Sequence, residues 1–306
     1  GDLRVYVIRN PNFNASMAPN GMMHIWTGLI VRASSTDEIA AVVGHEIAHY
    51  TRMHSLEQLR TLRNGMSIGA FFDIALELAT GLPVPVGQMT AMLNASAFSR
   101  QQENEADLLG AKLMAEADYD PHASYVVWQK ILAEEEAAVA KGYQPAGFIS
   151  THPPSAKRAA RLEQIVNDNY GPSSIGRFAD QALLDVLNNN YAMLMEDQLD
   201  TNRYGRTLEI LSRHAKIGVD MSLVNFFYGE TYRQRGADGD QALAIAAYYE
   251  SIAGSNPPAE AYKNLGYLLL KETDRAGAKA AFSQYLDLSP NASDRAMIEY
   301  YLEDLR

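Results

Sequence analysis

The sequence predicts a mainly α-helical protein with a small β-sheet, built as an α+β domain followed by an all-α repeat domain. Strand-like alternation is confined to the segment before Ser35, and helical periodicity dominates the rest of the chain. The last third adds the spacing of helix–turn–helix repeats. With 306 residues the chain is long enough for two domains. We place them at residues 1–172 and 173–306, because residues 167–176 contain the linker-like stretch Gly171-Pro172-Ser173-Ser174.

Two short strands are expected near the start of the chain. Leu3–Ile8 alternates in polarity, and Met22–Thr27 follows the turn Pro19-Asn20-Gly21. We expect the second strand to form a sheet edge that can pair with an extended peptide. His24 lies on this strand, and we expect a surface histidine there rather than a metal ligand.

A long amphipathic helix is predicted after these strands. Ser35 and Glu38 have the spacing of a capping box. Apolar residues then recur at steps of three and four, which predicts a helix with one buried face; they are Ile39, Val42, Val43, Ile47 and Tyr50.

The pentapeptide His45-Glu46-Ile47-Ala48-His49 lies two to three turns into this helix. Residues four apart share a helix face, so His45 and His49 can point two imidazole nitrogens at one ion, about 2.0–2.1 Å away for zinc. Glu46 can reach a water molecule at that ion and take its proton. Such a short pattern also arises by chance, so its buried helical context carries the argument. The motif indicates a zinc-dependent peptidase.

A third ligand is expected from the segment Ser99–Asp107, which leads into a second helical pattern. Glu103 and Asp107 are four apart and share a face. Glu103 could bind zinc while Asp107 accepts a hydrogen bond from the far nitrogen of a ligand histidine, for which we name His45. The alternative is a solvated acidic helix face, which we prefer for Glu105.

The first half of the chain resembles the HtpX and CaaX-prenyl-protease-like zinc metallopeptidases, which are gluzincins. Several segments in the order of that family carry the resemblance: Asn14-Ala15, Pro19-Asn20-Gly21, Thr27-Gly28-Leu29, His45-Glu46-x-x-His49 with Arg52 and His54, Glu103-x-x-Ala106-Asp107, and Thr151-His152-Pro153-Pro154 with Arg158.

The resemblance implies a zincin-type domain with one Zn²⁺ per chain, held by His45, His49 and Glu103. It also implies that Glu46 is the general base and that His152 and Arg158 lie near the open zinc position. Among the members of this family, the chain is most similar to the soluble BepA-type proteins, which implies a periplasmic location in the bacterial cell envelope and a C-terminal tetratricopeptide-repeat domain.

His152 precedes two prolines, which stiffen the backbone and favour an extended conformation. Three roles remain open. The imidazole could donate a hydrogen bond to the oxyanion of the reaction, it could occupy the open zinc position and keep the enzyme latent, or it could only support packing. Histidines 54, 122 and 214 are expected to be structural, with His54 helping to hold the end of the motif helix.

Tetratricopeptide-like spacing is present near the C-terminus. Its residues are Tyr262, Leu265, Gly266, Leu269, Ala278, Phe282, Tyr285 and Pro290. Gly229, with Tyr228 and Tyr232, marks a preceding unit about one repeat length before Gly266. Leu183–Ile217 is expected to form further, degenerate helix pairs. Stacked units of this kind make a concave groove for extended or helical peptides.

No segment is expected to span a membrane. Residues 65–82 are fairly apolar, but Asp73 and Glu77 interrupt them, and such charges are costly inside a bilayer. A second option is peripheral membrane contact through residues 65–95. The loop Gly81–Gly87 is either a lid or an ordinary connection.

The formal net charge of −11 argues against a nucleic-acid partner, and the absence of cysteine excludes disulfides. No signal peptide is visible at Gly1, and we expect a processed or trimmed form. The sequence predicts a zinc endopeptidase that acts on misfolded or unassembled envelope proteins, with repeats that recruit substrates or an envelope protein complex. The alternative is a repeat-based chaperone or binding scaffold with a latent or structural zinc site.

Overall fold

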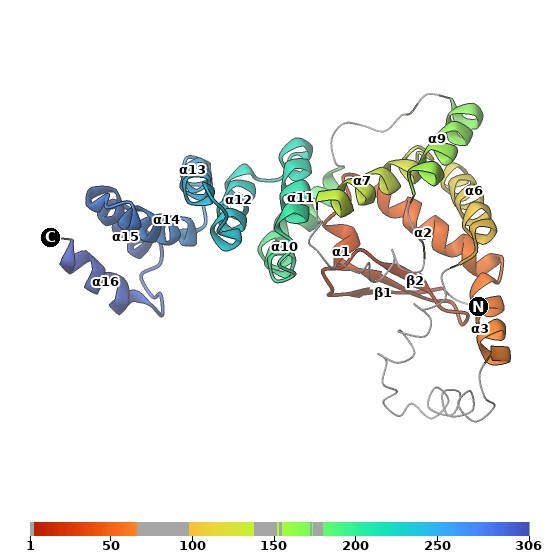
Figure 1. Ribbon diagram of the computed structural model, residues 1–306, viewed down its shortest axis with the longest axis horizontal. Helices are drawn as coiled ribbons and strands as arrows, with labels where there is room; N and C mark the ends of the chain where they lie inside the picture. Colours follow the sequence, from red (N-terminus) through yellow and green to blue (C-terminus); the bar gives the residue numbers. More distant parts are fainter. Residues whose placement is uncertain are drawn as a thin grey trace. The chain divides into compact units, whose positions relative to one another are not determined.

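The computed structural model describes residues 3–65, 98–137, 152, 155–171, 173 and 180–305. The chain divides into two compact units, Gly1–Asp180 and Gln181–Arg306, and each is described by itself (Figure 1). The predicted apolar segment after Gly65 and the loop Gly81–Gly87 lie outside the described residues. Within the described residues, no helix is long and apolar enough to cross a membrane.

A three-stranded sheet opens the first unit. Its strands are β1 (Arg4–Ile8), β2 (Ala15–Met17) and β3 (Met22–Trp26), in the order β1-β3-β2. β3 runs parallel to β1 and antiparallel to β2. Both predicted strands are confirmed, but the prediction that the second one is an edge is wrong. β2 covers its outer side, and three residues are too few to show alternation in a sequence.

The motif helix is α2 (Thr36–Thr51), which follows the short α1 (Thr27–Ile30) and precedes α3 (His54–Gly65). Ser35 caps it as predicted, because its hydroxyl accepts a hydrogen bond from the Glu38 amide at 3.3 Å. The returning half of the box differs from the prediction. The Glu38 carboxylate accepts from the amide of Ser34, at 3.0 Å, and also pairs with Lys130.

Three further helices complete the described part of the first unit: α6 (Arg100–Glu116), α7 (Ala123–Ala137) and α9 (Ala156–Tyr170). A capping box between Ser99 and Gln102 starts α6. Helix α2 packs against both α6 and α7, and α7 packs against α9. The shared core includes Phe13, Val42, Met114, Trp128, Ile131 and Leu162.

Two glycines let α2 and α6 approach closely. A Cβ atom at Gly110 would lie 3.0 Å from the His45 amide nitrogen, and one at Gly44 would lie 3.2 Å from the Gly110 carbonyl oxygen. Both distances are tighter than ordinary van der Waals contact. The crossing point therefore lies beside His45, and it brings the earlier turns of α6 next to the motif.

Helix α9 continues through Tyr170, so the predicted start of the linker at residue 167 is wrong. Gly171 ends the helix with a positive φ of 70°, as glycine readily does. The side chain of His122 holds this end, because its Nε2 lies 2.9 Å from the Gly171 carbonyl and its Nδ1 pairs with Asp120. His122 is therefore a buried structural histidine.

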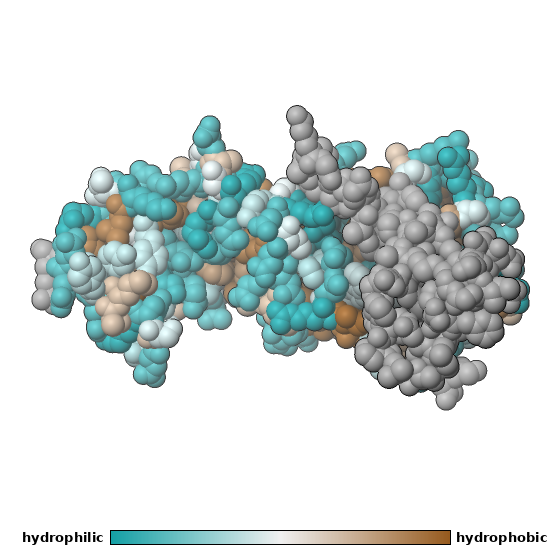
Figure 2. Space-filling view, turned by 60° about the horizontal axis from the view of Figure 1, so that its bottom comes forward, coloured by the Kyte–Doolittle hydropathy of each residue, from teal (hydrophilic) through white to brown (hydrophobic). Residues whose placement is uncertain are grey.

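The second unit is helical throughout its described residues. Its helices are α10 (Gln181–Leu199), α11 (Tyr204–Ile217), α12 (Met221–Arg235), α13 (Asp240–Ile252), α14 (Ala259–Lys271), α15 (Arg275–Leu288) and α16 (Arg295–Asp304). α12 packs against α13, and α14 packs against α15. The surface of this unit visible in Figure 2 is mostly hydrophilic.

The two helix pairs repeat one packing contact. A Cβ atom at Gly229 of α12 would lie 2.5 Å from the ring of Tyr248 on α13. At Gly266 of α14 the same atom would lie 2.6 Å from the ring of Phe282 on α15. In each pair, an aromatic ring of the second helix therefore fills the space that only a glycine of the first helix leaves open.

Candidate active site

Helix α2 presents the three motif side chains to the interior of the first unit. His45, Glu46 and His49 are all buried, with 4%, 4% and 2% of their surface exposed. The Nε2 atoms of the two histidines lie 3.1 Å apart. The four-residue spacing on one helix face therefore brings the two rings together, as the sequence predicts.

Helix α6 brings two carboxylates to this pair. The Glu103 carboxylate lies 3.7 Å from His45 Nε2 and 3.5 Å from His49 Nε2. On the next turn, Asp107 Oδ1 lies 3.1 Å from the other ring nitrogen of His45, Nδ1. Both carboxylates are buried. The acidic face is therefore not solvated at these two positions, whereas the side chain of Glu105 is 47% exposed.

His152 completes the group. Its Nδ1 lies 3.2 Å from His45 Nε2 and 2.8 Å from the Glu103 carboxylate. Its Nε2 lies 3.4 Å from Oε1 of Glu46. Among the described residues, one ligand atom from each of His45, His49, Glu103 and His152 falls within 4.8 Å of all the others, and all four side chains are buried.

The spacing of these donor atoms fits a zinc ion. Four ligands about 2.0–2.1 Å from zinc, at the corners of a tetrahedron, lie roughly 3.3–3.4 Å from one another. Five of the six pairs of side chains have donor atoms 2.8 to 3.7 Å apart, and one ligand atom from each of the four lies within 4.8 Å of all the others. Three imidazoles and a carboxylate are also a donor set that zinc accepts.

Burial keeps the imidazoles neutral. It lowers the pKa of His45 and of His49, and it lowers the pKa of His152 to about 3. Neutral imidazole is the form that binds a metal. Burial raises the pKa of the Glu103 carboxyl. For Asp107, hydrogen bonds from Arg158 and His45 outweigh burial, so its pKa is lowered and it stays an acceptor.

Glu46 lies beside the group without joining it. Its Oε1 atom is buried and accepts no hydrogen bond within the part of the chain that the structure describes. Burial, and then the nearby charge of Glu103, raises the pKa of Glu46 well above its usual range, against a hydrogen bond from the backbone of Met17. The carboxylate is therefore held between β2 and the four donors.

Arg158, at the start of α9, ties the two carboxylates of α6 together. Its guanidinium donates to both oxygens of Asp107, at 2.7 and 2.6 Å, and it also pairs with Glu103. The ring of Trp128 on α7 lies against the guanidinium, 4.0 Å from centroid to carbon, and against the edge of His45. Arg158 therefore holds both carboxylates in fixed positions.

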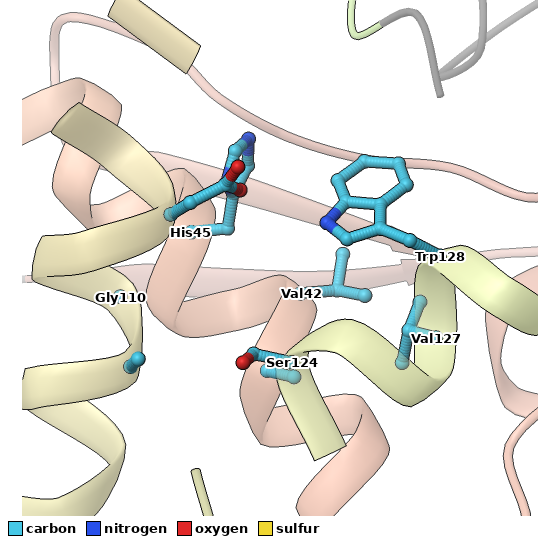
Figure 3. Close-up of a pocket in the computed structure, with 9 residues that line it drawn as sticks. Val42, His45, Gly110, Ser124, Val127 and Trp128 are labelled. Carbon is cyan, nitrogen blue, oxygen red and sulfur yellow. The ribbon is translucent and has the colours of Figure 1, made fainter. Parts of the chain in front are cut away.

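Trp128 and His45 also line a small cavity between α2, α6 and α7. Figure 3 shows both side chains at its upper side, with Gly110 and Ser124 below. On another side of the group, the ring of Phe98 packs against His49 and His152, at centroid distances of 4.1 and 5.0 Å. Aromatic rings therefore pack against the imidazole donors on two sides.

The structure brings all seven predicted site residues into one cluster: His45, Glu46, His49, Glu103, Asp107, His152 and Arg158. His24 lies on β3 and is not part of it. Sequence reasoning missed Trp128 and Phe98, and it gave His54 only a general role. Trp128 is one of only two tryptophans in the sequence, and this rarity was the one feature that could have drawn attention to it. No feature of the sequence singled out Phe98.

This arrangement is that of an H-E-x-x-H metallopeptidase centre. Residues 2–166 match the family model described as peptidase family M48. The chain belongs to this family.

Three relatives illustrate the match. The mitochondrial metalloendopeptidase OMA1 of Schizosaccharomyces pombe is 33% identical over 160 residues, which cover 52% of this chain and 45% of the relative. The putative beta-barrel assembly-enhancing protease of Vibrio cholerae is 31% identical over 48% of this chain and 31% of its own length. The beta-barrel assembly-enhancing protease of Yersinia pestis is 26% identical over 71% of this chain and 46% of its own length.

This chain spans less than half the length of each of these relatives. The family and the relatives support a metalloendopeptidase.

Proposed function

We propose that the chain is a zinc-dependent endopeptidase with one Zn²⁺ per chain. The observation that carries this proposal is the close approach of four buried donor atoms beside Glu46. His45, His49 and Glu103 are the proposed ligands. Zinc, when bound, polarises the carbonyl of a peptide bond and lowers the pKa of water to about 7.

Glu46 is the proposed general base. Its buried Oε1 faces the donor group and accepts no hydrogen bond from the described residues, so it can take a proton from the attacking water. A carboxyl whose pKa is raised by burial is a stronger base towards that water, and it holds the proton until the leaving amine takes it.

Asp107 and Arg158 are the proposed supports of the ligands. Asp107 Oδ1 lies 3.1 Å from His45 Nδ1 and favours the tautomer with its proton on Nδ1, which leaves the Nε2 lone pair for the metal. Arg158 holds Asp107 and Glu103 in fixed positions. Its guanidinium is already engaged by two carboxylates, so we assign it to positioning rather than to contact with the reacting atoms.

His152 is proposed to occupy the fourth ligand position of the zinc site. Its Nδ1 stands 3.2 Å from His45 Nε2 and 2.8 Å from the Glu103 carboxylate, so it lies among the proposed ligands, where a bound zinc would take the place of its hydrogen bond to Glu103. A ligand there displaces the attacking water. The conformation described here is then a latent one, and the His152 side chain must move before a substrate can bind.

Strand β2 is proposed to bind the substrate backbone. It lies at the sheet edge, and its residue Met17 contacts Glu46 through the backbone. Its outer side has no partner strand within the described ranges. An extended peptide added to this edge would pass the donor group, and main-chain pairing selects unfolded substrates.

The proposed substrates are misfolded or unassembled proteins of the bacterial cell envelope, with a periplasmic location. The names of the Vibrio and Yersinia relatives support this, whereas OMA1 is mitochondrial. Peripheral membrane contact through residues 65–95 belongs to the same proposal, as does the lack of a nucleic-acid partner.

The second unit is proposed to be a tetratricopeptide-repeat domain that recruits substrates or an envelope complex. The equivalent glycine–aromatic contacts of α12–α13 and α14–α15 support this class. A chain that ends after Asp180 tests it. It keeps the Asp180 carboxylate that accepts from the Thr36 amide at the start of α2. We expect this chain to cut a short unstructured peptide at the full rate and a natural protein target more slowly.

A second candidate function is a repeat-based chaperone or scaffold with a structural zinc site. The closed set of four protein donors favours it, because structural zinc sites lack an open position.

Metal analysis and a casein digest of the wild type and of Glu46→Gln separate the two functions. An endopeptidase contains about one zinc in both proteins and loses hydrolysis in the variant by about 10²–10⁴-fold. If both the wild type and the His152→Ala variant contain zinc but hydrolyse no casein, the scaffold function is favoured.

A further inference from the structure

The two histidines of the motif helix hold their second ring nitrogens in different surroundings. Nδ1 of His45 lies 3.1 Å from a carboxylate oxygen of Asp107. Nδ1 of His49 lies 3.0 Å from Nδ1 of another histidine, His54. The outer partner of His49 is therefore an imidazole, which either donates or accepts depending on where its proton sits.

His54 is the first residue of α3 and is 3% exposed. The turn that places it there contains Met53, which has a positive φ of 59°. Positive φ is uncommon for residues other than glycine and carries strain. The Met53 side chain is 60% exposed, so its own burial does not explain the turn. The turn brings the chain back against α2, so that the ring centroid of His54 lies 5.0 Å from that of His49.

The far side of His54 contacts α6. Its Nε2 lies 3.3 Å from Oε2 of Glu105, whose side chain is 47% exposed. The three side chains form a chain of contacts that runs from the donor group towards solvent. The sequence predicts that Glu105 lies on a solvated helix face. In the structure, its half-exposed carboxylate also forms the outer end of this series of side-chain contacts.

The carboxylate of Glu105 sets the direction of both hydrogen bonds. An ionised carboxylate only accepts, so His54 Nε2 carries a proton and donates it. A neutral imidazole has one proton, so His54 Nδ1 accepts. His49 Nδ1 must then be the donor in the contact of 3.0 Å. This leaves His49 Nε2 with its lone pair directed at the donor group, 3.1 Å from His45 Nε2.

We propose that His54 and Glu105 are positioning residues that fix His49 in the tautomer able to bind a metal through Nε2. They do for His49 what Asp107 does for His45. The inference rests on the proposed role of His49 as a zinc ligand. His54 is buried and has the larger effect, whereas water can replace the half-exposed Glu105.

Zinc affinity of the full chain, measured by competition with a chelator, tests the proposal. His54→Leu removes the acceptor, and we expect weaker zinc binding by about 10–100-fold, the usual loss for an outer partner of a metal ligand. His54→Gln supplies an amide oxygen in place of Nδ1 and should recover most of the affinity. Glu105→Gln should lose less than His54→Leu. His24→Leu, outside the donor group, is the matched control and should bind as the wild type does.

A second readout separates positioning from general support of the fold. Nitrogen-15 spectra of the zinc-loaded wild type should show His54 protonated at Nε2 and unprotonated at Nδ1. The opposite tautomer would overturn the proposal even if His54→Leu fails to fold. Melting curves of the metal-free variants report whether they fold.

His49→Ala distinguishes failure of this inference from failure of the proposed function. If His49→Ala loses zinc and a folded His54→Leu binds as tightly as the wild type, the inference is wrong and the metal site stands. If His49→Ala also binds as tightly as the wild type, His49 is not a ligand and both fail.

Discussion

Two buried polar clusters, one in each unit of the chain, are built in opposite ways. In the first unit, three imidazoles and one carboxylate come together, from His45, His49, His152 and Glu103. In the second unit, the carboxylate of Glu230 is surrounded by donors. They are the guanidinium of Arg233, the amides of Gln234 and Asn264, and the hydroxyl of Tyr248.

The difference shows which cluster requires a ligand. Around Glu230, every described contact pairs a donor with the carboxylate, so the cluster is complete within the protein. At the first cluster, Asp107 and His54 lie next to the Nδ1 atoms of His45 and His49. In the tautomers proposed for these two histidines, their Nε2 lone pairs face each other across 3.1 Å. Facing lone pairs repel unless a cation lies between them. Burial alone therefore does not identify a metal site; the balance of donors and acceptors does.

Replacing the central carboxylate of each cluster should produce the largest contrast. We expect Glu103→Ala to weaken zinc binding by more than the roughly 10–100-fold loss typical of an outer partner, since a direct ligand is removed. Glu230→Ala should leave zinc binding unchanged. Metal titration of both variants checks this. Equal zinc affinity of Glu103→Ala and the wild type would place the third ligand elsewhere.

Glu230 should instead control the stability of the second unit. Removing it leaves Tyr248 and Asn264 without their acceptor, at a cost of about 1–3 kcal/mol for each buried group left unsatisfied. Hydrogen bonds from Arg233 and Tyr248 outweigh burial and lower the pKa of Glu230. Its stabilisation is therefore complete above the unfolded pKa of about 4.3 and is lost as the pH falls further.

Acid unfolding of the wild type and of Glu230→Gln measures this effect. The variant should be less stable at neutral pH and should show a smaller loss of stability in acid. An identical pH dependence in the two proteins would mean that Glu230 contributes nothing through its charge.

Features of the first cluster that lie within one helix follow from the sequence, and contacts between distant segments do not. Helical periodicity predicts that His45 and His49 share a face, and the Ser35 cap predicts where that helix begins. The bonds of Arg158 to Asp107 join residues far apart in the chain, and no period in the sequence encodes them. The short β2 is also invisible, because three residues cannot display alternation.

The crossing of α2 and α6 was another feature that the sequence did not indicate. A glycine inside a helix signals a close approach only when its neighbour is known. Gly110→Ala should force the helices apart by a few tenths of an ångström and cost about 1–3 kcal/mol of stability. The same shift moves Glu103 relative to His45, so zinc affinity should fall with it. Melting and metal titration test this, with Leu108→Ala on the exposed side of α6 as the control.

His152→Ala is expected to have the smallest effect and to be the most informative about the first cluster. With His152 at the fourth corner, only the fraction of molecules in which it has moved away can bind substrate. If that fraction is about 10%, removing the imidazole raises the turnover of a short peptide about tenfold. Zinc remains bound by His45, His49 and Glu103. An oxyanion donor predicts the opposite sign, a fall of about 10²–10³-fold.

Turnover of a short unstructured peptide by His152→Ala, at equal zinc content, decides between these roles. Glu46→Gln in the same background should abolish the gain, which excludes a contaminating peptidase. Lower turnover would make His152 part of the reaction. Unchanged turnover, zinc content and melting temperature would leave it with neither role. The second cluster offers the contrasting control: Asn264→Ala removes a donor to Glu230 and should not change peptide turnover in either direction.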